Sequence, residues 1–129
     1  MSILPQVRVM VVDDQVTSRM LLSEALKELG FSQITIMGDG EQAMKTMVDR
    51  PHHLVISDFN MPRMDGLQLL KAIRTHQTTR KAGFLMLTAR GDRALVQEAA
   101  RLGANNVLSK PFDMPTLRKA IEAVIGPLS

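Results

Sequence analysis

Five short apolar segments alternate along the chain with stretches whose apolar residues recur every three or four positions, and this alternation limits the fold most strongly. The apolar segments cover residues 7–12, 33–37, 54–57, 84–87 and 106–108. Apolar runs without polar alternation are typical of parallel strands that are covered on both faces. Strands that alternate with helices predict an α/β fold, with five βα units in a doubly wound, five-stranded parallel sheet and helices on both faces.

The helical stretches carry start and stop signals at their ends. Asp39 and Asp65 each precede a glutamine by three residues, which is a variant of the capping box. We expect Asp113 to cap the fifth helix, Gly30 to end the first one in a left-handed conformation, and the fourth helix to cover about residues 92–102. No linker, repeat or low-complexity segment interrupts the pattern. We therefore expect a single domain over residues 1–129, with no output domain.

The net charge of +3 does not indicate a nucleic-acid-binding protein. The basic residues are scattered, and the four aromatic residues, all phenylalanines, offer no platform for stacking single strands. Helix-turn-helix, zinc-finger and basic-zipper patterns are missing. The longest apolar runs are far shorter than the roughly 20 residues that span a bilayer, and no signal peptide is visible. We expect a cytoplasmic protein that binds neither nucleic acid nor membrane.

Nitrogen and sulfur ligands for a metal are scarce. The chain contains no cysteine, which excludes disulfides and thiolate metal sites. The three histidines, His52, His53 and His76, are expected to face solvent or to lie at the ends of elements rather than to bind metal.

Polar residues follow four of the five predicted strands. Asp13 and Asp14 come after the first strand, Asp58 after the third, Thr88 after the fourth and Lys110 after the fifth. In open α/β sheets, ligands bind outside the carboxyl ends of the strands. We therefore expect three carboxylates, a hydroxyl and an ammonium group to converge at one edge of the sheet.

Each of these residues has a structural explanation when it is taken alone. Asp13 and Asp14 could be turn and cap residues, and the segment after Asp58 is rich in turn formers. A threonine often ends a strand, and a lysine is usually solvated. Together, however, each close pair of carboxylates costs roughly 3 kcal/mol at an effective dielectric near 20. Like charges held together at such a cost indicate a functional site.

The chemistry of this group predicts a metal ion and a phosphoryl ligand. Oxygen-only donors favour a hard cation such as Mg²⁺ or Mn²⁺. Three carboxylates and one ammonium carry a formal charge of −3 + 1 = −2, which one divalent ion neutralises. A dianionic phosphoryl group could then approach, with Thr88 and Lys110 holding its oxygens. A carboxylate in this position can act as a nucleophile and become an acyl phosphate.

Five motifs stand in order along essentially all of the chain: Val12-Asp13-Asp14, Asp58 with Met61-Pro62-x-Met64-Asp65-Gly66, Thr88-Ala89, Gly103-Ala104 and Lys110-Pro111-Phe112. In this order and spacing they resemble the response-regulator receiver domains, and among these the stand-alone chemotaxis regulators of the CheY type. The resemblance implies a flavodoxin-like sheet with strand order 2-1-3-4-5. It also implies a two-component phosphorelay protein, not an enzyme, with only self-phosphorylation from small donors and slow autodephosphorylation.

The resemblance assigns roles to the residues at the sheet edge. Asp58 would accept a phosphoryl group from a CheA-like histidine kinase or a small phosphodonor. The ligands of Mg²⁺, for which Mn²⁺ could substitute, would be Asp13, Asp14, Asp58 and the backbone carbonyl of Asn60. Thr88 and Lys110 would hold the phosphoryl oxygens, and the Lys110–Pro111 peptide bond is expected to be cis.

The chain departs from the family pattern at the residues that report phosphorylation. Most members carry an aromatic residue three positions before the lysine, which swings inward as the threonine moves; here that position is Val107. The usual aromatic readout coupled to Thr88 therefore cannot operate in its usual form. Arg90 and Asn60 flank the route that the hydrolytic water takes in the family. These departures leave the phosphorylation site itself unchanged.

The expected partners are a histidine kinase, a phosphatase and a flagellar motor switch protein or another target. The target would bind a monomer on the face around the fourth helix, the fifth strand and the fifth helix. A phosphate sink or a non-chemotaxis single-domain regulator is the main alternative. A haloacid-dehalogenase-like phosphatase is more remote, because such enzymes need an acid two residues after the nucleophile and Asn60 stands there. The intact Asp58, Thr88 and Lys110 argue against a pure interaction module.

Overall fold

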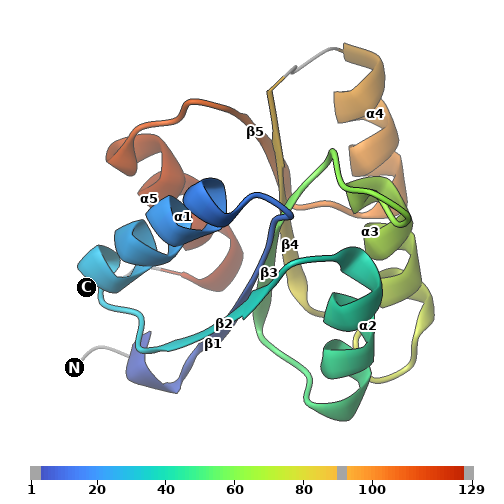
Figure 1. Ribbon diagram of the computed structural model, residues 1–129, viewed down its shortest axis with the longest axis horizontal. Helices are drawn as coiled ribbons and strands as arrows, with labels where there is room; N and C mark the ends of the chain where they lie inside the picture. Colours follow the sequence, from blue (N-terminus) through green and yellow to red (C-terminus); the bar gives the residue numbers. More distant parts are fainter. Residues whose placement is uncertain (1–3, 90–92, 127–129) are drawn as a thin grey trace.

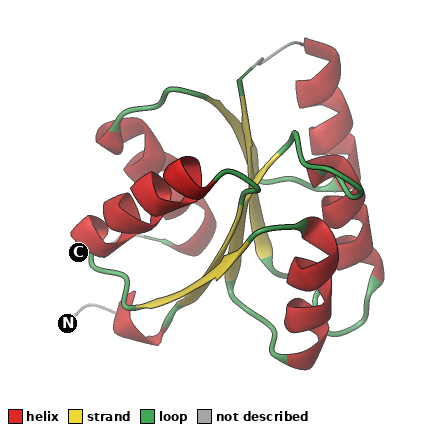
Figure 2. Ribbon diagram, viewed as in Figure 1, coloured by secondary structure: helices red, strands yellow, loops and turns green. Residues whose placement is uncertain are grey.

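The computed structural model describes residues 4–89 and 93–126 and places a parallel sheet between two layers of helices (Figure 1, Figure 2). The strands are β1 (Arg8–Val12), β2 (Gln33–Met37), β3 (Leu54–Asp58), β4 (Gly83–Thr88) and β5 (Asn106–Ser109). The helices are α1 (Val16–Leu29), α2 (Gly40–Asp49), α3 (Gly66–Thr75), α4 (Arg93–Leu102) and α5 (Met114–Ile125). A short 3-10 helix, η1 (Leu4–Gln6), precedes β1.

The five strands are all parallel and lie in the order β2-β1-β3-β4-β5. Helices α1 and α5 cover one face of the sheet, and α2, α3 and α4 cover the other (Figure 1). This arrangement confirms the predicted doubly wound α/β fold and the strand order that the family resemblance implied. Because every strand runs the same way, the carboxyl ends of all five meet at one edge of the sheet.

The core consists of two apolar clusters, one on each face of the sheet. In β1, Val9 and Val11 belong to the cluster under α1 and α5, whereas Met10 and Val12 belong to the cluster under α2, α3 and α4. All four side chains are fully buried. Successive residues of a strand point to opposite faces, so an unbroken apolar run is what this two-sided core requires.

The edge strands differ from the prediction that every strand is covered on both faces. Strands β1, β3 and β4 are buried almost throughout, but β2 and β5 each have one neighbouring strand and are only partly covered. Ile36 of β2, for example, is 43% exposed. The strand ends differ as well, because β3, β4 and β5 each extend one residue further than predicted. Asp58 and Thr88 are therefore the last residues of their strands.

The helix ends follow the capping signals in the sequence. Asp39 accepts a hydrogen bond from the backbone N–H of Gln42, Asp113 caps α5, and Asp65 forms a complete capping box at the start of α3. Gly30 ends α1 with φ 111°. The predicted caps are confirmed, with the complete capping box at Asp65 and the single hydrogen bond from Gln42 at Asp39. Asp92, the expected start of the fourth helix, lies outside the described residues. None of the helices within residues 4–89 and 93–126 has both the length and the apolar character of a membrane span.

Candidate functional site

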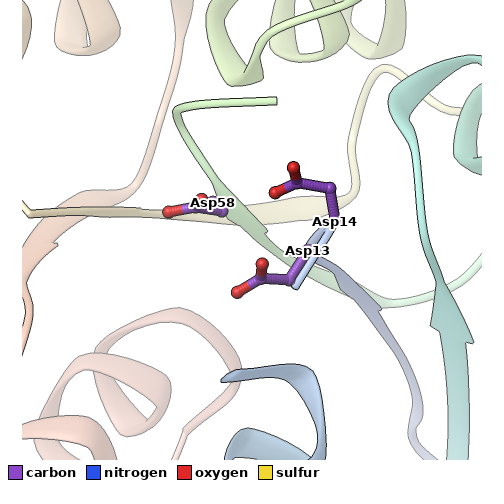
Figure 3. A group of neighbouring side chains, drawn as sticks. All are labelled: Asp13, Asp14 and Asp58. Atoms are coloured by element: carbon purple, nitrogen blue, oxygen red, sulfur yellow. The ribbon is translucent and has the colours of Figure 1, made fainter. Parts of the chain in front are cut away.

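Three carboxylates meet at the carboxyl edge of the sheet (Figure 3). Asp13 and Asp14 directly follow β1, and Asp58 ends the neighbouring strand β3. One oxygen from each of the three lies within 4.8 Å of the others. Asp13 and Asp58 are only 2% and 9% exposed, whereas Asp14 faces solvent. The structure thus brings together the three acids that the sequence predicted, in a group that opens to solvent on the side of Asp14.

Lys110 extends from the end of β5 to this group and pairs with two of the acids. Its Nζ lies 3.2 Å from Asp13 Oδ2 and 3.2 Å from Asp58 Oδ1. The backbone N–H of Lys110 donates to the carbonyl oxygen of Thr88 at 2.8 Å, and the Lys110–Pro111 peptide bond is cis. Thr88 ends β4 and is buried. Four parallel strands therefore supply the hydroxyl, the ammonium and the carboxylates to one edge.

Short backbone contacts fix the position of Asp58. The N–H of Phe59 donates to the carbonyl oxygen of Leu87 at 2.8 Å, and the N–H of Gly66 donates to the carbonyl oxygen of Phe59 at 2.8 Å. A Cβ on Gly66 would lie 2.7 Å from the Asp58 carbonyl oxygen and 2.5 Å from Met86 Sδ. Because backbone leaves no room there, only glycine lets α3 begin directly against the end of β3.

Burial and charge shift the pKa values of the paired groups. Burial raises the pKa of Asp58, the Lys110 ammonium offsets part of that shift, and the carboxylates of Asp13 and Asp14 add to it. Burial alone would lower the pKa of Lys110, but the carboxylates of Asp58 and Asp13 outweigh it and raise that pKa. The ionised form of Asp58 therefore lowers the stability of the fold, while Lys110 keeps its positive charge.

The donor set fits a hard divalent cation. Asp13, Asp14 and Asp58 offer oxygen ligands only, and they are the one group of this kind among residues 4–89 and 93–126. With Lys110 the formal charge is −3 + 1 = −2, which a divalent ion balances. Small, hard cations bind through one or a few carboxylates and keep several waters, and the exposed side of Asp14 leaves room for them.

The other predicted site residues are Asn60, Val107 and Arg90. Asn60 is exposed in the loop after β3. Val107 of β5 is half-buried and packs against the core cluster under α2, α3 and α4. Arg90 lies outside the described residues. Sequence reasoning missed Ser18, whose Oγ lies 3.0 Å from Lys110 Nζ, because a serine in the first turn of a helix is common.

His52 lies between the end of α2 and the start of β3, as one of the two predicted alternatives has it, but the other alternative, that it faces solvent, is wrong. His52 is only 5% exposed and lies at the opposite edge of the sheet from the acids. Its Nε2 lies 2.8 Å from Thr35 Oγ1, and its Nδ1 lies 2.7 Å from the carbonyl oxygen of Arg50. The Nε2 contact thus joins β2 to the connection between α2 and β3, and the Nδ1 contact lies within that connection; both are structural.

Known proteins are similar to this chain in sequence and in fold. The family model of the response regulator receiver domain matches residues 9–122. A probable chemotaxis protein CheY of Rhizobium etli is 65% identical over 128 residues, which cover 99% of each chain. The BeF3-activated NMR structure of the response regulator Chey2-Mg2+ from Sinorhizobium meliloti is 64% identical, covers 100% of both chains and has a TM-score of 0.75. Chemotaxis protein CheY4 of Vibrio cholerae is 32% identical, covers 92% of this chain and 98% of its own, and has a TM-score of 0.85.

Proposed function

Because the chain belongs to the family of response regulator receiver domains, we propose that it is a chemotaxis-type two-component response regulator that is phosphorylated on Asp58. The observation that carries this proposal is the position of Lys110, whose ammonium lies between the carboxylates of Asp13 and Asp58 at 3.2 Å from each. As a receiver domain the chain is a signalling protein, and the haloacid-dehalogenase-like alternative is set aside. We take residues 1–129 as one receiver domain that acts on separate proteins through its surface.

The proposed transfer uses Asp58 as the nucleophile. A carboxylate oxygen of Asp58 attacks the phosphorus of a phosphohistidine, and a P–O bond forms as the P–N bond breaks. The imidazole leaves with the electron pair of that bond and is then protonated by solvent. Lys110 and Thr88 hold the oxygens of the transferred group, Lys110 by charge and Thr88 by its hydroxyl.

We propose Mg²⁺ as the ion at this site. Its ligands would be the carboxylates of Asp13, Asp14 and Asp58 and the backbone carbonyl of Asn60. When bound, the ion supplies positive charge that offsets the charge of the carboxylates and of the phosphoryl oxygens. The choice of Mg²⁺ is supported by the oxygen-only donor set and by the related Sinorhizobium meliloti protein, which was solved with Mg²⁺.

The proposed donor is a CheA-like histidine kinase, and the proposed target is a component of the flagellar motor switch. The target would bind the face formed by α4, β5 and α5. Phosphorylation changes the charge at Asp58 and so biases two conformations that differ in affinity for the partner. Val107 in β5 replaces the aromatic residue that reports this change in most relatives, so movement of Thr88 must reach the face through aliphatic packing.

The phosphorylation step can be tested by intact-mass measurement. The wild-type chain, incubated with a small acyl phosphate and Mg²⁺, is expected to gain one phosphoryl group, and chelation of the ion is expected to suppress the gain. Asp58→Asn should show none, whereas Glu24→Gln, which removes an exposed acid on α1, should react like the wild type. A wild-type chain without an adduct, or an Asp58→Asn chain with one, contradicts the proposal.

The role in motor control needs a separate binding measurement. Affinity for a peptide from a flagellar motor switch protein should rise when the chain carries a beryllofluoride mimic of the phosphoryl group. A chain that takes up the phosphoryl group rapidly but binds the peptide in neither state would instead be a phosphate sink that drains a shared kinase.

A further inference from the structure

The Lys110 ammonium has a third partner that the proposed chemistry does not use. Ser18 Oγ lies 3.0 Å from Nζ, closer than the 3.2 Å that separates Nζ from Asp13 Oδ2 and from Asp58 Oδ1. A lysine ammonium has three protons to donate and no capacity to accept. Three oxygens, supplied by α1 and by the ends of β1 and β3, thus match its three donors.

Ser18 stands where the site borders an apolar groove. The groove has a volume of about 430 Å³ and lies between α1 and the connection from β5 to α5. Its lining includes Leu21, Leu22 and Phe112, and only Ser18 and Lys110 contribute polar side chains to it. On this side of the site the serine hydroxyl is therefore the only side-chain oxygen that the lining offers to the ammonium.

We propose that Ser18 is a positioning residue for phosphoryl transfer, because its hydroxyl holds the Lys110 ammonium toward Asp13 and Asp58. This inference rests on the proposed function of Asp58 as phosphoacceptor. Without the hydroxyl, the flexible lysine side chain can turn its head away from the carboxylates and lay its apolar stem along the groove. The contact also keeps Nζ near Asp58 while the negative charge of that side chain changes.

The chemical type of the residue supports this role. A hydroxyl is a neutral acceptor and adds no charge to a cluster that already carries −2 with Lys110 included. A carboxylate at the same place would increase the repulsion between the acids, and an apolar side chain would leave one proton of the ammonium without a protein partner. Serine combines an acceptor with a small volume in the first turn of α1.

Three variants separate positioning from support of the helix. Ser18→Ala removes the hydroxyl, and Ser18→Thr restores one at the same position. Thr17→Ala removes an exposed hydroxyl from the neighbouring residue of the same turn and is the matched control. Because alanine has the higher helix propensity, a purely structural role in α1 predicts that Ser18→Ala melts at the same temperature as the wild type or higher and reacts at the wild-type rate.

Two readouts decide the proposal. The rate of phosphorylation by a small acyl phosphate should fall about tenfold in Ser18→Ala, equivalent to about 1.4 kcal/mol in the barrier, and should return to within about threefold of wild type in Ser18→Thr. In the metal-free protein, the ¹H–¹⁵N signal of the Lys110 ammonium should be seen in the wild type and broadened by faster exchange in Ser18→Ala. Thr17→Ala should change neither readout.

The outcomes that overturn the proposal are distinct from those that overturn the function. A Ser18→Ala chain with the wild-type rate and the wild-type ammonium signal refutes the role of Ser18 alone, as does an equal loss of rate in Thr17→Ala. A wild-type chain that takes up no phosphoryl group refutes the proposed function and this role with it.

Discussion

Replacing Asp58 by asparagine is expected to stabilise the metal-free chain near neutral pH. The variant keeps the shape of the side chain and removes one charge from a group of three acids, of which Asp13 and Asp58 are buried. At 4.8 Å, repulsion between two carboxylates amounts to about 3.5 kcal/mol at an effective dielectric near 20. The attraction of Asp58 to Lys110 at 3.2 Å amounts to about 5 kcal/mol on the same scale.

Burial is the largest cost of the charge on Asp58, and the two repulsions offset much of its attraction to Lys110. Since Asp14 is exposed, solvent weakens its share, and we expect the free energy of unfolding to rise by about 1–2 kcal/mol in the variant. For a chain of this length that change raises Tm by roughly 3–8 °C. Thermal melts in a chelating buffer measure it, with Glu24→Gln as a control for the loss of an exposed acid.

The pH dependence of this difference has a defined sign. The pKa of Asp58 is raised in the fold, so the folded wild type holds this proton more tightly than the unfolded chain does. Its stability contribution is present in acid and is lost as the pH rises through the raised pKa. The advantage of Asp58→Asn should therefore grow with rising pH and vanish in acid. Excess Mg²⁺ should reverse the order, because only the wild type keeps all three carboxylates.

Two results would refute this reasoning. One is an Asp58→Asn chain that melts at or below the wild-type temperature in the chelating buffer near neutral pH. The other is a difference between the two chains that persists unchanged in acid, because it could not then come from the charge of Asp58.

Three further substitutions test other parts of the account. Lys110→Met should lower Tm in the metal-free state, because two buried carboxylates lose their counter-charge. An unchanged Tm would show that the ion pairs of Lys110 with Asp13 and Asp58 do not stabilise the fold. Burial lowers the pKa of His52, so the wild type should lose stability relative to His52→Gln as the pH falls below about 6.5. If the unfolding free energies of the two proteins, measured in urea, change with pH in parallel, this prediction is wrong. The guanidinium of Arg74 donates to the carbonyl oxygens of Arg80, Ala82 and Gly103. Arg74→Met should therefore lower the free energy of unfolding, measured in urea, by about 2–4 kcal/mol. A loss below about 0.5 kcal/mol would show that water replaces these hydrogen bonds.

The βα units could be predicted because their signals are local. Caps such as Asp39 and Asp113 are read within four residues, and apolar runs mark the strands wherever they lie in the sheet. Position in the sheet is not a local property: the apolar residues of β2, including Ile36, look like those of the central strands. The strand order came from the family resemblance, and the residues themselves did not mark β2 and β5 as the exposed edge strands.

The site was predictable to the extent that it depends on strand ends. Asp13, Asp58 and Lys110 each stand at or just after the end of a parallel strand, so topology alone brings them to one edge. Ser18 lies inside a helix, and its contact depends on how α1 packs beside the connection from β5 to α5. The burial of His52, which lies in the connection before β3, likewise depends on a partner in β2. Such contacts between elements leave no periodic signal in the sequence.

Mapping the phosphorylated residue tests the central claim most directly. An aspartyl phosphate can be reduced with borohydride to homoserine, and peptide mass spectrometry then locates the product. After reaction with a small acyl phosphate and Mg²⁺, we predict homoserine at position 58 of the wild-type chain and at no other aspartate. Homoserine at position 13 or 14, or a phosphoryl group retained on a histidine, would contradict the assignment of Asp58 as the phosphoacceptor.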